Sequence, residues 1–163
     1  MRTQAEQIAA IRADQKLWRA LAAEVGPARY AEPGPMGEWS FAEMAGHLAG
    51  WRDRTINRLR AVGRGEPEPA SPWPADLKED DEVDKINAWI REQHADRSPE
   101  QLVADYDGSY DRLIEALEGL PAHLQSAVVP WTGEPLVDVD FTGHLRDEHV
   151  APVRAWLDRS RAS

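Results

Sequence analysis

Apolar side chains recur at three- and four-residue intervals along four parts of the chain, which predicts helices that each bury one face. The first part covers residues 3–24. Gly26 and Pro27 end it, because glycine tolerates the left-handed cap and proline cannot continue the hydrogen-bond ladder. Its apolar positions are Ile8, Ile11, Leu17, Trp18, Leu21 and Val25.

The second predicted helix begins at Ser40 and ends near Gly63. Ser40 and Glu43 have the spacing of a capping box, in which each side chain accepts a hydrogen bond from the other residue's backbone N–H. At about 100° per residue, His47 falls at the edge of the apolar face, beside Trp51. That face consists of Phe41, Met44, Leu48, Trp51, Thr55, Leu59 and Val62.

Two stretches rich in proline read as connections. Residues 31–38 predict a loop. Residues 63–82 hold four prolines among acidic side chains, and such a segment can cross the molecule in an extended form. We expect Trp73, in the middle of the second connection, to fasten it to the bundle. The prolines are Pro67, Pro69, Pro72 and Pro74.

Helical spacing returns over residues 83–96 and again after a second capping box, formed by Ser98 and Gln101. Gly119 ends the longer of these two helices. We expect a short helix and a long one to meet at residue 98. One possible arrangement is a single continuous helix that bends there.

A final helix is predicted from a cap at Asp138 or Asp140 to about Asp158. Pro152 lies inside it, where proline lacks an N–H and crowds the carbonyl of Glu148, so a kink or loosened turn is expected. The inward face carries Phe141, Leu145, His149, Pro152 and Trp156. The sum is one all-α domain over residues 1–163, a four-helix bundle with a long crossover connection.

Composition narrows the range of functions. The chain has no cysteine, so a metal site must use histidine or carboxylate ligands. The formal net charge of −10 disfavours binding to nucleic acid or to an anionic membrane surface. No apolar run is long enough to span a membrane, and the N-terminus lacks the apolar core of a signal peptide, so we expect a cytoplasmic protein.

The candidate chemistry rests on histidines. His47 lies on the second helix, and His144 and His149 lie on the last. Three imidazoles from two helices can hold a metal ion and leave a position open. His144 and His149 are five residues apart, however, and therefore about 140° apart on a regular helix, so both can reach one ion only if the helix is distorted. Glu148, four residues after His144, is the other candidate ligand. His94 and His123 receive no role.

The segments GEWSFAEMAGHLAGWRDR, DKINAWIREQHADRSPEQLVADYDGSYDRLIEAL and HLRDEHVAPVRAWL, in this order and spacing, resemble the DinB-like, or YfiT-like, superfamily. The resemblance implies an up-up-down-down bundle, often dimeric. It also implies a metal site with one histidine on the second helix and two on the fourth, four residues apart. His47 and His149 match two of these positions. The third falls on Leu145, so His144 or Glu148 would have to complete the set.

Related architectures include thiol-dependent transferases and the mycothiol-dependent maleylpyruvate isomerase. The resemblance therefore implies an enzyme of the transferase or hydrolase kind, with zinc or nickel on His47, His149 and His144 or Glu148. Such an enzyme would act on a small electrophile, with a low-molecular-weight thiol as a further cofactor. Two alternatives stay open: a metal-free protein that binds or neutralises a small molecule in the same pocket, as in relatives that protect against a genotoxin, and a homodimeric structural module.

Overall fold

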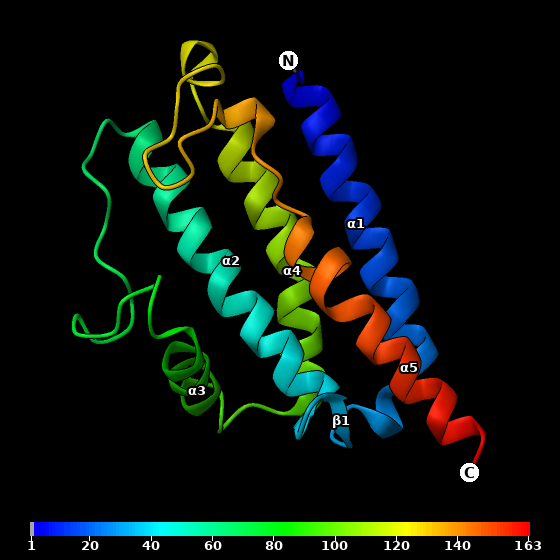
Figure 1. The fold of residues 1–163 in the computed structure, drawn as a ribbon. Helices are drawn as coiled ribbons and strands as arrows, with labels where there is room; N and C mark the ends of the chain where they lie inside the picture. The colour runs from blue at the N-terminus through cyan, green and yellow to red at the C-terminus, as the bar shows by residue number, and fades with distance from the viewer. Residues whose placement is uncertain (1) are drawn as a thin grey trace.

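The computed structural model describes residues 2–163 and confirms the all-α prediction. The bundle consists of α1 (Gln4–Val25), α2 (Phe41–Gly63), α4 (Pro99–Glu118) and α5 (Val150–Arg161). A shorter helix, α3 (Val83–Gln93), packs on the outside of α2 (Figure 1). Short helical turns lie at η1 (Pro27–Arg29), η2 (Ala122–Leu124), η3 (Leu136–Asp138) and η4 (His144–His149). Within residues 2–163, no helix is both long and apolar enough to cross a membrane.

The directions of α1, α2 and α4 fit the lengths of the links between them, and α5 runs opposite to α4 (Figure 1). The short link between α1 and α2 holds a hairpin of β1 (Pro33–Met36) and β2 (Trp39–Ser40), where residues 31–38 had been expected to form only a loop. Such a link makes α1 and α2 run in opposite directions, whereas the long connection lets α4 run the same way as α2 (Figure 1). The order is therefore up, down, down, up with one crossover, and not the up-up-down-down order that the resemblance implied.

The long crossover connection is fastened to α2 by ion pairs. Arg54 donates to Glu68 and Glu79 over 2.8 and 3.0 Å and to the carbonyl of Pro69 over 2.6 Å. Arg58 binds the same two carboxylates. Trp73 is buried, as expected, in a small apolar cluster with residues of α3. An acidic loop that reads as solvated is thus held at a defined place beside α2.

A short helix, α3, and a long one, α4, are present as predicted, but they are separate, so the alternative of one bent helix is wrong. A turn between residues 94 and 98 divides them, and α3 leans against α2 instead. The contact is close because Gly50 has no side chain: a Cβ there would lie 2.8 Å from Cγ2 of Ile90. The second capping box forms at Ser98 as predicted, which gives α4 its own start.

Aromatic residues from three helices fill the centre of the bundle. Trp18 of α1 stacks on Phe41 of α2, with ring centroids 4.9 Å apart and planes 6° from parallel. Tyr106 of α4 meets Trp18 edge-on at 4.7 Å. On α1, Gln7 donates to the carbonyls of Leu136 and Val139, over 2.7 and 3.1 Å. That pair of bonds ties the segment leading into η4 to the bundle, and so positions the last histidines.

Candidate metal site

The last helix begins with a π-helical turn, η4, over the interval His144–His149. Its hydrogen bonds run from residue i+5 to residue i, as in the bond from the N–H of Val150 to the carbonyl of Leu145. Because a π-turn holds more residues than an α-turn, side chains five positions apart come to the same side. The distortion that the spacing of His144 and His149 required is therefore present.

Pro152 gives a physical reason for the wider turn. In a regular α-helix the N–H of residue 152 would bind the carbonyl of Glu148, which here belongs to η4. Proline has no N–H and its ring crowds that carbonyl. Regular α-helical bonding starts afresh at Val150, where α5 begins, and Pro152 then lies in a first turn, where its missing N–H matters little.

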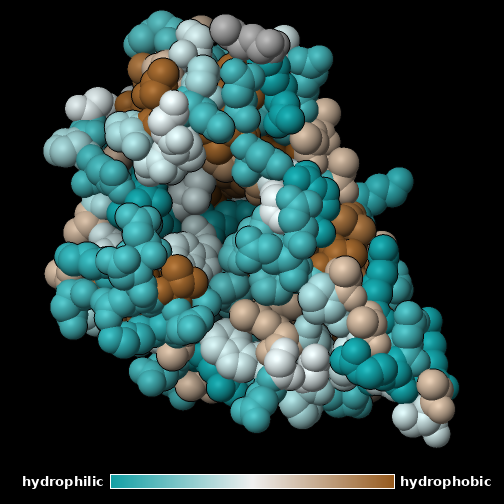
Figure 2. Space-filling model, viewed as in Figure 1, coloured by the Kyte–Doolittle hydropathy of each residue, from teal (hydrophilic) through white to brown (hydrophobic). Residues whose placement is uncertain are grey.

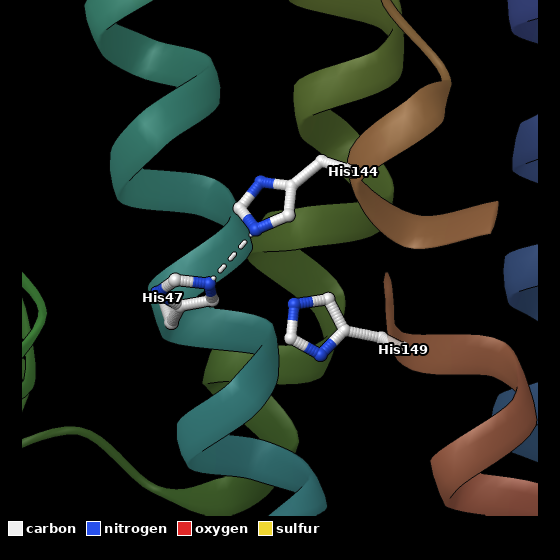
Figure 3. Close-up of side chains that lie close together, drawn as sticks. All are labelled: His47, His144 and His149. Carbon is white, nitrogen blue, oxygen red and sulfur yellow. Dashed lines mark hydrogen bonds between the residues drawn. The ribbon is translucent and has the colours of Figure 1, made fainter. Parts of the chain in front are cut away.

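Three imidazoles converge between α2 and the start of the last helix. Nε2 of His47 and Nε2 of His144 are 3.0 Å apart. The ring centroid of His149 lies 5.4 Å from the ring centroid of His47 and 5.1 Å from that of His144. Figure 3 shows each ring turning a nitrogen toward the other two. One nitrogen from each ring can be chosen so that all three lie within 4.8 Å of one another.

Burial keeps these imidazoles neutral. His47 and His149 are 4% and 6% exposed, while the side chain of His144 is 34% exposed. Burial, followed by repulsion from the other two histidines, lowers the pKa of His47 to about 3. Burial also lowers the pKa of His144 and of His149 to about 4, helped by Arg52 for the first and by His144 for the second. Near neutral pH all three are in the form that binds metal ions.

The site fits a divalent ion of the zinc type. Nε2 of His149 is buried and, among the described residues, has no hydrogen-bond partner, which is unusual for a polar atom unless a ligand fills the gap. Three nitrogen donors without thiolate suit zinc or nickel. In a tetrahedral zinc site with bonds of about 2.0–2.1 Å, two nitrogens lie about 3.3–3.4 Å apart. The nitrogens here, within 4.8 Å of one another, would have to draw closer when an ion binds.

The structure separates the candidates for the third position. Leu145 is fully buried in the hydrophobic core. Glu148 is 67% exposed, and its carboxylate lies 3.8 Å from Nε2 of His144. His144 is the residue that joins the cluster, so the wider turn replaces the usual four-residue spacing. His94 follows α3 and lies against Gly46, and His123 lies in η2, so neither belongs to the cluster.

A cleft of about 510 Å³ opens beside the three histidines. Its other walls come from the β1 end, the acidic connection and α3, at Met36, Glu79, Asp80 and Asn87. Asn87 accepts a hydrogen bond from Nε1 of Trp51 over 2.8 Å. No pattern in the sequence singles out Asn87, and Glu79 belongs to a run of acidic residues that reads as surface. The tertiary fold brings both of them to the cleft.

Comparison with known proteins agrees with the fold. An uncharacterised protein from Escherichia coli UTI89 has a similar structure, with a TM-score of 0.72 at 14% sequence identity over 99% of this chain and 96% of the other. No curated protein matches the chain at a significant level. The family model of the DinB superfamily matches residues 10–146, a stretch that includes His47 and His144. The chain belongs to the DinB superfamily.

Proposed function

We propose that this protein is a metal-dependent enzyme in which His47, His144 and His149 hold one zinc or nickel ion. The observation that carries the proposal is the convergence of three imidazoles, two of them buried, whose ring nitrogens lie within 4.8 Å of one another beside an open cleft. Three protein ligands with a free position are the arrangement of catalytic rather than structural zinc sites.

The reaction class follows from that free position. A divalent ion there would lower the pKa of a bound water or thiol and polarise an electrophile. The chain has no cysteine of its own, so a thiol nucleophile would have to be a small molecule. We therefore propose transfer of a low-molecular-weight thiol, or of water, to a small electrophilic substrate in the cleft.

Residues of the cleft suit this chemistry. The carboxylate of Glu148 is exposed and lies 3.8 Å from Nε2 of His144, where it can accept the proton that a nucleophile loses. The side chains of Met36 and Trp51 give an apolar wall for the body of a substrate. Glu79 is held by two arginines and closes the side of the cleft nearest the long connection.

Metal content tests the proposal directly. Protein purified, loaded with zinc or nickel and dialysed should retain about one ion per chain by elemental analysis. His47→Ala and His149→Ala should each lose it, while the matched controls His94→Ala and His123→Ala, outside the cluster, should keep it.

Failure of the wild-type protein to retain an ion would overturn the proposal. The direct contact between His47 and His144, 3.0 Å between Nε2 atoms, would then favour the second candidate function. In that case the cluster is a self-contained hydrogen-bonded group, and the protein binds a small molecule without metal.

A further inference from the structure

A second, smaller cavity adjoins the cleft. It has a volume of about 210 Å³ and lies between α2, α4 and the segment that leads into η4. Trp51, Thr55 and His144 line both spaces, so His144 stands at the boundary between them. Figure 2 shows this face of the molecule hollowed near its middle. A molecule that reached the histidines could therefore extend a group into the second cavity.

Arg52 is one of the residues that line this cavity. The residue is 9% exposed. Its Nη1 donates to Oγ of Ser109 over 3.1 Å and its Nη2 donates to the hydroxyl of Tyr106 over 2.9 Å. The group also lies 3.8 Å from the ring centroid of Tyr110. All these partners are neutral, and a guanidinium has five N–H donors, so several remain available.

The carboxylate nearest to Arg52, that of Asp14, accepts no direct hydrogen bond from it. Asp14 approaches Arg52 only to 3.8 Å, and it accepts its short hydrogen bond, 2.7 Å, from Tyr110. Burial raises the pKa of Asp14, so the attraction to Arg52 does not offset the removal of the carboxylate from water. A buried ion pair is favourable only with direct, well-aligned hydrogen bonds, and this pair has none.

A second arginine on the same helix shows what a completed site looks like. Arg54, also buried, donates to the carboxylates of Glu68 and Glu79 and to a backbone carbonyl. Its charge is matched by two carboxylates within hydrogen-bond distance. Arg52, two residues earlier, is buried equally deeply, but the nearest carboxylate, that of Asp14 at 3.8 Å, accepts no hydrogen bond from it, so its guanidinium can still take up a second anion.

We infer that the cavity beside Arg52 binds the carboxylate of a small organic acid, with its apolar or aromatic body against Trp131 and Phe141 and its reactive end toward His144. The planar guanidinium fork matches a carboxylate with two parallel hydrogen bonds. The inference rests on the proposed function for its catalytic meaning, since it names the substrate class of the same site.

The charge of Asp140 favours a carboxylate over a phosphate. The carboxylate of Asp140 also lines the cavity and would repel a doubly charged group more strongly than a singly charged one. The carboxylate of Asp140 accepts hydrogen bonds from Thr142 and Arg146, so it does not serve as the counter-ion of Arg52. The volume of about 210 Å³ also suits one small group rather than a whole cofactor.

The test uses benzoate as the probe, with benzamide and inorganic phosphate as comparisons. Titration calorimetry on the metal-free and the zinc-loaded full chain should show benzoate binding at least tenfold more tightly than either comparison. Arg52→Gln should weaken benzoate binding at least tenfold, and the control variant Arg60→Gln, at an exposed position near the end of α2, should leave it within twofold. Arg52→Lys keeps the buried positive charge but loses the planar pair of donors of the guanidinium, so it should also weaken benzoate binding tenfold. This variant provides the test if Arg52→Gln does not fold.

The outcomes separate this inference from the metal proposal. Benzoate binding to metal-free protein that is lost in the Arg52 variants supports the inference, even if the protein retains no metal. Equal binding by wild type and by folded Arg52 variants would overturn it, even if zinc is bound stoichiometrically. Tighter binding of phosphate than of benzoate would overturn the assignment to carboxylates.

Discussion

The Nε2 atoms of His47 and His144 lie 3.0 Å apart, although 97 positions separate the two residues in the sequence. One imidazole comes from the middle of the bundle on α2 and the other from a distorted turn at the start of the last helix. The contact exists because the crossover connection sets α2 beside that turn and because the turn is wide enough to present His144. Several measurable consequences follow for the chain.

Replacing Pro152 by alanine should weaken metal binding. Alanine supplies the N–H that donates to the carbonyl of Glu148 in a regular helix. The π-turn is then less favoured relative to a regular α-helical turn. His144 would rotate away from His149, and we expect at least tenfold weaker zinc binding in a competition titration with a chelator. The exposed control Arg154→Ala should leave the affinity unchanged. Equal affinities for Pro152→Ala and wild type would show that the wide turn does not depend on the proline.

Placing two histidines four residues apart on the last helix, by Leu145→His, should destabilise the protein rather than improve the metal site. Leu145→His would place an imidazole four residues before His149, but Leu145 is fully buried in the core. The change exchanges packed apolar surface for a buried polar ring, so the free energy of unfolding should fall by about 2–5 kcal/mol, as for other disruptive core substitutions. Leu145→Met, which nearly conserves volume, should cost less than about 1.5 kcal/mol. Denaturant titrations measure both, and a stable Leu145→His protein with tighter zinc binding would contradict this account of the site.

Metal-free protein should lose stability as the pH falls below about 6. The pKa of His47 is lowered to about 3 and that of His149 to about 4, while both are near 6.5 in the unfolded chain. Between those values the unfolded chain takes up protons that the folded chain does not, so the stability present above pH 6.5 is lost on acidification. Each histidine can add up to about 1.4 kcal/mol per pH unit to that slope.

Thermal unfolding in the presence of a chelator between pH 7 and pH 4.5 measures this slope. The double variant His47→Gln/His149→Gln keeps every carboxylate and should show a clearly shallower decline. Identical slopes for the variant and the wild type would mean that the two imidazoles are not buried in the neutral form.

The docking of α3 should be sensitive to Gly50. A Cβ at this position would lie 2.8 Å from Ile90, so Gly50→Ala should push α3 away from α2 and reduce stability by roughly 1–3 kcal/mol. Because α3 carries Asn87, the wall of the cleft would move too. Ile90→Ala removes Cγ2, Cγ1 and Cδ1, the three atoms nearest to that Cβ, and should be less harmful in the Gly50→Ala background than in wild type. A double-mutant cycle checks this, and additive losses would show that the two residues do not press on each other.

Local pattern alone was enough to place α1, α2, α3 and α4, but not the start of the last helix, which was expected at Asp138 or Asp140 and lies at His144. The periodicity of apolar residues, the capping boxes at Ser40 and Ser98 and the proline-rich connection act over a few residues, so they can be read without knowing the fold. For the same reason the sequence predicted the superfamily and identified His47, His144 and His149 as candidate metal ligands. The homodimer remains a prediction.

Only the folded chain decided how these parts meet. A five-residue spacing on a regular helix separates His144 from His149. Pro152 predicted a kink or loosened turn there, but only the folded chain shows that the turn widens by one residue and brings the two rings together. The place of Asn87 in the cleft and the 3.8 Å separation of Arg52 from its nearest carboxylate, Asp14, depend on contacts between distant elements. Such contacts are set by packing between helices, which local sequence does not encode.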